Sequence, residues 1–474
     1  MLKAPLANAV EDYIARGRVR GHMPGHKGQA GGYLARFGEL APWDLTEADG
    51  LDDLHSPQGA IKETQTLMAR ACGAREAFLL VNGATSGIQA AVLAACRPGD
   101  TLLLPRNAHR AVWSAMALGD IKPCWLPVGV HNGLPLALTP AQIDAALTDH
   151  PEVKAVFLLN PSFYGVFGDL PACIAAARRH NVITIIDEAH GAHLPFAAPS
   201  LAAARLGADL TVDSWHKSMG SLGQTAVLLN NRADLHPGHW LTLLQTSSPS
   251  YPLLASLDLA RAEWQKYSAV RVQKLHDAAA AVNAAVSGLQ NLRIITAADL
   301  PSGFAYDETK VLLHSAAGHT GWQIAEALRA CGVEPEFADS RFALYLLTYA
   351  DGGAEQLCAA LPKADTLLPP GHHGLAEYPL GPFLLPKAAQ SPFAAAHAPR
   401  REVALEHAVV MISAGLLTPY PPGIPAVGMG EVISAELAAG LKMLLQAGGR
   451  VQGINNGRVA VIDETGAAVL AQPR

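Results

Sequence analysis

The feature that most constrains the fold is a regular alternation of short apolar runs with Ala-rich stretches from Ala77 to Leu229. Runs that are almost wholly apolar are typical of strands covered on both faces. The expected strands are Ala77–Val81, Thr101–Pro105, Ala155–Asn160, Val182–Asp187, Leu210–Asp213 and Thr225–Leu229. The expected helices between them are Ser86–Cys96, His109–Leu118, Pro140–Leu147, Leu170–His180 and Leu201–Leu206. This order predicts an α/β fold with a mainly parallel sheet flanked by helices.

Composition excludes several classes of protein. Half of the residues are hydrophobic and 16% are charged, so the chain is globular rather than disordered. The formal net charge is −6, which argues against a nucleic-acid binder. No membrane span or signal peptide is evident, so we expect a cytoplasmic protein that does not bind membranes. The six cysteines are far apart and form no C-x-x-C pair, and we predict no metal site.

An acid and a lysine follow two of the expected strands. Asp187 ends one apolar run in Asp187-Glu-Ala-His190, and Lys217 follows another in Ser214-Trp-His216-Lys217. Ligands of open α/β sheets bind at the carboxyl ends of strands. Taken singly, Asp187 is explained as a turn or helix-capping residue and Lys217 as a surface lysine. Together they favour a site with a nucleophilic amine and a buried acid.

A glycine turn supplies a third element. The segment Gly83-Ala84-Thr85-Ser86 lies between an expected strand and an expected helix, where free N–H groups bind phosphate. Such turns are common and are weak indicators alone. A phosphate site, an amine for an aldehyde and an acid for a pyridine nitrogen are the contacts that pyridoxal phosphate requires. Ser214 and His216 could add hydrogen bonds to the phosphate.

These motifs, in this order, resemble fold-type I pyridoxal-phosphate enzymes and in particular the bacterial ornithine/lysine/arginine decarboxylase family. Three further segments share the resemblance, which covers about residues 10 to 435: Gly21-His-Met-Pro-Gly-His26-Lys-Gly28, Gly50-Leu-Asp-Asp53-Leu-His55-Ser-Pro57, and Pro419-Tyr-Pro-Pro-Gly-Ile-Pro425 with Gly430-Glu431. The chain departs from the family pattern at Trp215, where a small residue is frequent, and at Met429, where proline is common.

The resemblance implies roles for matching residues. Lys217 would form the Schiff base with the cofactor, Asp187 would pair with its ring nitrogen, and His190 would lie near its hydroxyl or the substrate carboxylate. Ala189 and His109 would pack on opposite faces of the ring. The phosphate would be held by Gly83, Ala84, Thr85, Ser86, Ser214 and His216.

The resemblance also implies an organisation. Residues 1–60 would contribute to the active site and to dimer contacts, and residues 61–260 would form the large cofactor-binding α/β domain. Residues 261–367 would form a small α+β domain, and residues 368–474 a linker and C-terminal domain. The length resembles that of the short family members without an N-terminal wing domain. A homodimer or higher homo-oligomer is expected.

The implied activity is decarboxylation of arginine, lysine or ornithine to an amine of polyamine biosynthesis. An aminotransferase or another lyase would share the sheet, acid and lysine, with Arg341 or Arg401 as a carboxylate-binding residue. A cofactor-binding regulatory protein without activity is a weaker alternative. The residues do not distinguish the three basic amino acids.

Overall fold

The computed structural model describes residues 2–29, 31–350, 353–369, 385–420 and 423–463. It divides into two compact units, which are described separately. The first comprises Met1–Ala94, Thr184–Leu275 and Thr348–Ala350, and the second comprises Ala95–Ile183, His276–Leu347 and Asp351–Arg474. In these described ranges, no helix is long and apolar enough to cross a membrane.

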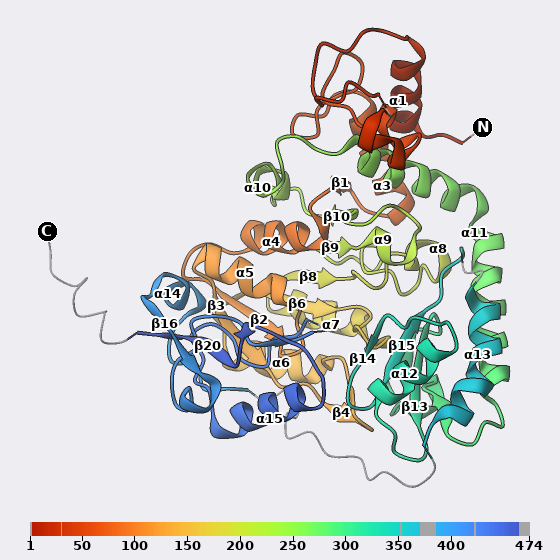
Figure 1. The fold of residues 1–474 in the computed structure, drawn as a ribbon. Helices are drawn as coiled ribbons and strands as arrows, with labels where there is room; N and C mark the ends of the chain where they lie inside the picture. The colour runs from red at the N-terminus through yellow and green to blue at the C-terminus, as the bar shows by residue number, and fades with distance from the viewer. Residues whose placement is uncertain (1, 30, 351–352, 370–384, 421–422, 464–474) are drawn as a thin grey trace, which may run out of the picture. The chain divides into compact units, whose positions relative to one another are not determined.

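The first unit contains four adjacent strands labelled in Figure 1. Their order is β1 (Glu76–Leu80), β10 (Ala226–Asn230), β9 (Leu210–Asp213) and β8 (Ile183–Asp187). β10 runs antiparallel to β1 and to β9, whereas β8 and β9 are parallel. Consequently β1, β9 and β8 all run in one direction, and their carboxyl ends lie at the same edge.

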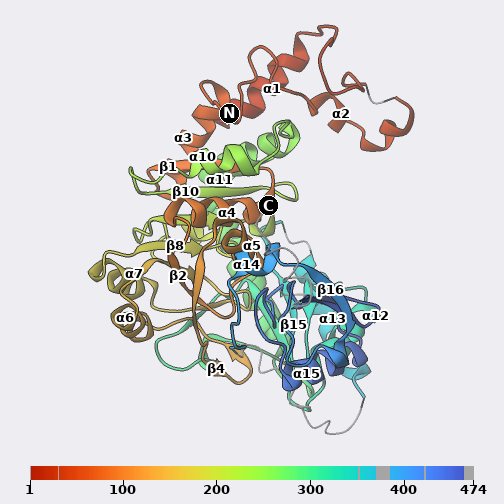
Figure 2. The same cartoon turned by 90° about the vertical axis from the view of Figure 1, so that its left-hand side faces the viewer.

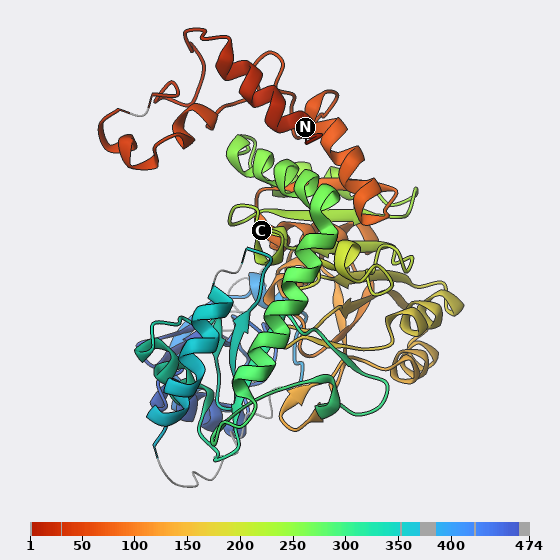
Figure 3. The same ribbon diagram turned by 90° about the vertical axis from the view of Figure 1, so that its right-hand side faces the viewer.

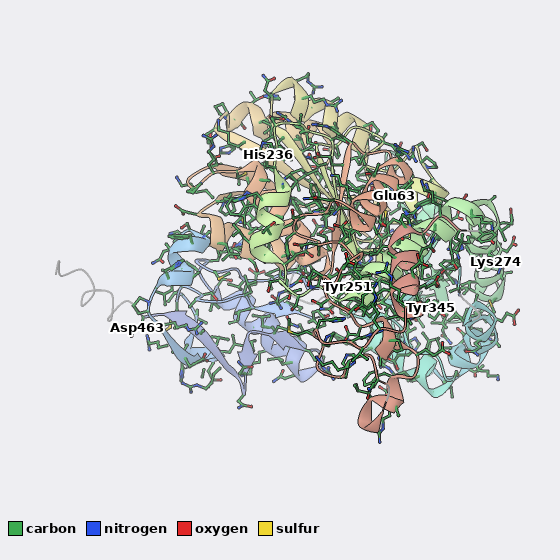
Figure 4. The ribbon with its side chains drawn as sticks, turned by 90° about the horizontal axis from the view of Figure 1, so that it is seen from above. Glu63, His236, Tyr251, Lys274, Tyr345 and Asp463 are labelled. Carbon is green, nitrogen blue, oxygen red and sulfur yellow. The ribbon has the colours of Figure 1, made fainter. Side chains whose placement is uncertain are left out.

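Helices of the first unit pack against these strands or against one another. They are α1 (Pro5–Ala15), α2 (Leu40–Trp43), α3 (Ala60–Cys72), α4 (Gly83–Ala95), α8 (Leu194–Ala197), α9 (Trp215–Ser218), α10 (Pro237–Leu244) and the beginning of α11 (Tyr251–Val286). Figure 3 shows α11 along its length, and Figure 4 labels Tyr251 at its start and Glu63 on α3. The hydroxyl of Tyr251 donates a hydrogen bond to the carbonyl of Asp52 at 2.5 Å.

Asp258 of α11 explains where α1 begins. The residue before α1 is Ala4, which has no side chain that can cap a helix. Instead, the buried carboxylate of Asp258 accepts the N–H groups of Leu6 at 2.8 Å and Ala7 at 3.3 Å. The same carboxylate pairs with Arg261 at 2.6 Å. A side chain more than 250 residues away in the sequence therefore accepts two of the free N–H groups of this helix.

The segment between α1 and α3 extends away from the strands of its unit (Figures 2 and 3). It includes η1 (Gly32–Phe37) and α2. Four apolar side chains in it are exposed: Val19, Met23, Phe37 and Leu40. The first unit thus presents apolar surface on a projecting segment.

The second unit contains three parallel strands with the order β6 (Val153–Leu159), β2 (Thr101–Pro105) and β3 (Lys122–Leu126). Its helices near these strands are α5 (Arg110–Gly119), α6 (Pro140–Asp149) and α7 (Leu170–Arg179). Thr139 forms a capping box with Gln142 at the start of α6, and Asp169 caps α7. Short paired strands accompany them: β4 (Val130–His131), β5 (Leu134–Pro135), β7 (Val166–Phe167) and β12 (Ala305–Tyr306).

Two smaller sheets complete the second unit. An antiparallel sheet has the order β11 (Leu292–Ile294), β13 (Lys310–Ser315), β15 (Ala343–Leu346) and β14 (Phe337–Ala338), with α12 (Gly321–Ala330) and α13 (Gly353–Leu367). The C-terminal part contains α14 (Pro392–His397), β16 (Arg400–Ala404), η3 (Leu405–His407), β17 (Thr418–Pro419), α15 (Ala435–Gln446), β18 (Val451–Gln452), β19 (Ile454–Asn455) and β20 (Arg458–Ile462). The expected linker after Leu368 falls partly outside the described residues.

The α/β fold with mainly parallel strands and flanking helices is confirmed. The expected helix Leu201–Leu206 is wrong, because this segment forms turns. Gly207, at φ +85°, ends a single turn there, and Glu188 accepts the N–H of Ala203 at 2.9 Å. The sequence pattern also did not predict that β10 is antiparallel.

Candidate active site

Three strand ends bring the predicted residues of the first unit to one edge. β1 leads into Gly83 and α4, β9 leads into Ser214 and Lys217, and β8 ends at Asp187. The strand register pairs Asp187 with Val212 and Asp213 with Val227. Because these three strands run in one direction, their carboxyl ends form one ligand-binding edge of the kind found in open α/β sheets.

Lys217 contacts His190 at this edge. The Nζ atom of Lys217 lies 2.9 Å from Nε2 of His190. His190 is buried and Lys217 is half-buried. The short helix α9 carries Lys217, and the N–H of Lys217 donates to the carbonyl of Ser214 at 3.2 Å. The amine therefore has a titratable neighbour with which it can exchange a proton.

Asp187 is the buried acid beside this lysine. Burial raises the pKa of its carboxyl group, while the charge of Lys217 and the N–H of Ala189 oppose that rise. The Ala189 N–H donates to Oδ1 of Asp187 at 3.1 Å. Ala189 is buried as well. A carboxylate in this environment is stabilised by a cationic partner.

The start of α4 provides donors and space. α4 begins at Gly83, whose φ is +75°, and a Cβ atom there would meet only the carbonyl of Gln224, at 3.9 Å. The Ser86 hydroxyl donates to the carbonyl of Gly83 at 2.9 Å. Ala84, Thr85 and Ser86 lie in the first turn, where backbone N–H groups have no partner within the helix. This turn can bind an anion.

Ser214 and His216 form a small network next to Lys217. The Ser214 hydroxyl lies 3.2 Å from Nδ1 of His216, and that nitrogen lies 3.0 Å from the carbonyl of Thr225. Since a carbonyl only accepts, Nδ1 of His216 carries a proton. This arrangement fixes the His216 ring beside Ser214.

His109 lies in the second unit. It is the N-cap of α5, and its Nδ1 accepts the N–H of Ala111 at 3.2 Å. Gly423 packs against its ring, since a Cβ atom on Gly423 would lie 3.4 Å from Cδ2 and Nε2. Of the predicted site residues, only His109 belongs to the second unit.

Two acids near the site were not predicted. Glu188 directly follows Asp187 at the end of β8, Asp213 ends the neighbouring strand β9, and both are fully buried. Burial, and then the nearby Asp187, raise the pKa of Asp213 to about 8. Both residues stand at apolar strand ends, which is the signal that identified Asp187.

Trp215, where the chain departs from the family pattern, is fully buried and contacts the ring of Phe196, so it is a core residue.

Asp52, in the Gly50-to-Pro57 segment, has a structural role. Its carboxylate accepts the N–H groups of Gln58, Gly59 and Ile61 at 2.8–2.9 Å, which caps α3. Backbone hydrogen bonds, against the effect of burial, lower the pKa of Asp52.

The polar groups of the first unit are those needed to bind pyridoxal phosphate. An amine beside a histidine, a buried carboxylate and an open helix start are the groups that would hold its aldehyde, ring nitrogen and phosphate. The open space at Gly83 is the structural observation that supports the phosphate position.

Comparisons with known proteins agree with this chemistry. Residues 4–300 match the family model described as Orn/Lys/Arg decarboxylase, major domain. The chain is 33% identical to the uncharacterized protein YaaO of Bacillus subtilis, with coverage of 95% of this chain and 96% of the relative. It is 32% identical to arginine decarboxylase of the same organism, with 95% of both chains covered. The lysine decarboxylase LdcF of Francisella novicida has a similar structure, with a TM-score of 0.83 at 17% identity, over 97% of this chain and 81% of that one.

Proposed function

Because the chain belongs to the Orn/Lys/Arg decarboxylase family, we propose that it is a pyridoxal-phosphate-dependent decarboxylase that converts a basic L-amino acid to an amine and carbon dioxide. Among the three basic amino acids we propose arginine as the substrate, since several relatives that match over nearly their whole length are named arginine decarboxylases. The observation that carries the proposal is the contact of Lys217 with His190 beside the buried Asp187.

In this proposal, different residues of the first unit hold different parts of the cofactor. Lys217 would hold the cofactor through its aldehyde, Asp187 would hold a proton on its ring nitrogen, and Ala189 would pack against the ring. The first turn of α4 (Gly83, Ala84, Thr85 and Ser86), with Ser214 and His216, would bind the phosphate. Pyridoxal phosphate supplies the electron sink for the electron pair left by the departing carboxylate. Burial of Asp187, Ala189 and His190 limits the access of water.

Proton transfer follows from the 2.9 Å contact. One proton can move between Nζ of Lys217 and Nε2 of His190. Either atom can then deliver it to the carbon that has lost its carboxylate. From the family resemblance we also propose that His109 packs on the cofactor ring.

We also propose a homodimer. The exposed apolar side chains of the projecting segment, Val19, Met23, Phe37 and Leu40, form a surface of the kind that a second subunit covers. In this proposal, residues 1–60 contribute to the dimer contacts and to the active site.

The proposed function is tested by carbon dioxide release. Purified protein with pyridoxal phosphate is supplied with L-arginine, L-lysine, L-ornithine and a neutral amino acid, and the amine product is identified. We expect release with a basic substrate, and Lys217→Ala should abolish both release and the absorbance of covalently held cofactor. The exposed Lys62 of α3 supplies a control, since Lys62→Ala removes a lysine outside the Ser214–Lys217 motif. Absence of release combined with amino-group transfer to a keto acid would favour an aminotransferase.

A further inference from the structure

A buried ion pair joins two sequence motifs of the second unit. Arg106, which follows β2, donates from Nη1 and Nη2 to the two carboxylate oxygens of Glu431, each at 2.8 Å. Both side chains are almost completely buried, at 1% and 3% exposed. A two-point pair of this kind fixes orientation as well as distance. Arg106 lies three residues before His109.

The surroundings of Arg106 restrict it further. Its guanidinium lies 5.5 Å from the ring centre of Trp113 and 5.0 Å from that of Trp125. Its N–H donates to the carbonyl of Leu126 at 3.0 Å, which continues the pairing of β2 with β3. The side chain and backbone of Arg106 are therefore both held at the turn that leads to α5.

Glu431 connects this turn to the C-terminal motif. Its Oε2 also accepts the N–H of Gly428 at 2.6 Å, and Arg106 donates to the carbonyl of Ala426 at 3.0 Å. Gly428 lies so close to Trp113 of α5 that a Cβ atom there would be 1.8 Å from the indole. Any side chain at residue 428 would displace Trp113.

The same motif lies next to His109. The N–H of Arg110 donates to the carbonyl of Gly423 at 3.2 Å, and Gly423 packs on the His109 ring. Gly423 has a φ of +87°, which favours glycine. The His109 ring thus has the Ala111 N–H of its own helix as one neighbour and Gly423 of the C-terminal motif as another.

We propose that Glu431 is a positioning residue that, through Arg106 and the 426–428 backbone, fixes the turn carrying His109 and thereby sets the affinity for pyridoxal phosphate. This inference rests on the proposed function, in which His109 contacts the cofactor. Nothing in it requires Glu431 to touch cofactor or substrate.

A double-mutant cycle tests the proposal. Cofactor affinity is measured by absorbance titration of the cofactor-stripped protein for the wild type, Glu431→Gln, His109→Ala and the double variant. Glu431→Gln should weaken binding on the order of tenfold, within the range for residues of one network. In the His109→Ala background the same change should weaken binding less than twofold. Equal effects in both backgrounds, or no effect of Glu431→Gln, would overturn the proposal.

Two controls separate positioning from general loss of stability. Glu402→Gln removes an exposed carboxylate from β16 of the same C-terminal part and should leave the affinity unchanged. If Glu431→Gln fails to fold, Arg106→Met with Glu431→Leu removes both charges and leaves no uncompensated buried ion. A folded double replacement with wild-type cofactor affinity would contradict the proposal.

The outcomes also separate this inference from the proposed function. If the protein bound pyridoxal phosphate but released no carbon dioxide, the double-mutant cycle could still be measured. Only the proposed decarboxylation would then be refuted. A wild-type protein that bound no pyridoxal phosphate would overturn both.

Discussion

Three buried acids at the ends of the neighbouring strands β8 and β9 lie in different environments. Asp187 has the charge of Lys217 nearby, which opposes the effect of burial on its pKa. Asp213 instead experiences Asp187 as a like charge, and its pKa is raised to about 8. Glu188 accepts the N–H of Ala203. Cys72 of α3 also lies near Asp213 and Glu188, whose charges add to the burial that raises its pKa.

Asp213 should make stability depend on pH. In the unfolded chain an aspartate loses its proton near pH 4, whereas folded Asp213 keeps it to about pH 8. Between these values the folded state binds one proton more, so the free energy of unfolding should fall as pH rises, by about 1.4 kcal/mol per pH unit for this group. Asp213→Asn should remove that slope, as measured by urea unfolding between pH 5 and 8.

The control for this prediction is an acid shifted in the opposite direction. A hydrogen bond from Arg232 lowers the pKa of Asp234 to about 2, so this group stays ionised in both states above pH 5. Asp234→Asn should therefore keep the wild-type slope. Equal slopes for wild type and Asp213→Asn would show that Asp213 is not protonated in the folded protein.

At the scale of elements, close packing of α4 on the strands depends on Gly87. A Cβ atom there would lie 2.7 Å from Cδ1 of Leu80 and 2.8 Å from Cγ1 of Val212. These residues belong to β1 and β9, the strands that lead into the first turn of α4 and into Lys217. α4 can approach both strands because residue 87 has no side chain.

Gly87→Val should lower the free energy of unfolding by about 1–3 kcal/mol through overpacking. It should also weaken cofactor binding, because the start of α4 would move relative to β9. Gln89→Val introduces the same branched side chain into α4 at a half-buried position and measures the effect on the helix alone. A stability loss equal to that of Gln89→Val would rule out the packing explanation.

The sequence predicts elements well where apolar runs are continuous. β2 and β9 begin and end as expected, because each run is bounded by a polar residue or a proline. β3 was not predicted, since Lys122-Pro-Cys-Trp-Leu126 contains a lysine and a proline. The hydrophobic pattern could not predict strand direction, because an apolar run such as that of β10 does not show whether the strand is parallel or antiparallel to its neighbours.

At the scale of the whole molecule, the homodimer proposal predicts a concentration-dependent assembly. Light scattering of the wild type should give twice the chain mass, and Val19→Asp with Phe37→Asp should shift the mass toward the monomer and lower activity. Leu118→Asp changes an exposed leucine of α5 and should leave the mass unchanged. A fully active wild-type monomer would contradict a site completed by two subunits.

The candidate site was predictable in part, for a physical reason. Lys217, His190 and Asp187 could be grouped because strands that run in one direction place their following residues at one edge. The pair of Arg106 and Glu431 could not be predicted from charge, since 325 residues separate the partners and neither has a local pattern that identifies the other. In the sequence, Glu431 was noted only because the Gly430-Glu431 segment resembles a motif of the family.

The separation of Arg106 and Glu431 by 325 residues has a consequence for synthesis of the protein. At about 5–20 residues per second, the ribosome adds Glu431 roughly 16–65 s after Arg106. During that interval the guanidinium of Arg106 lacks the carboxylate that it has in the folded chain, and a buried ion without its partner is strongly destabilising. The turn between β2 and α5 therefore reaches its final structure only after Glu431 has been added.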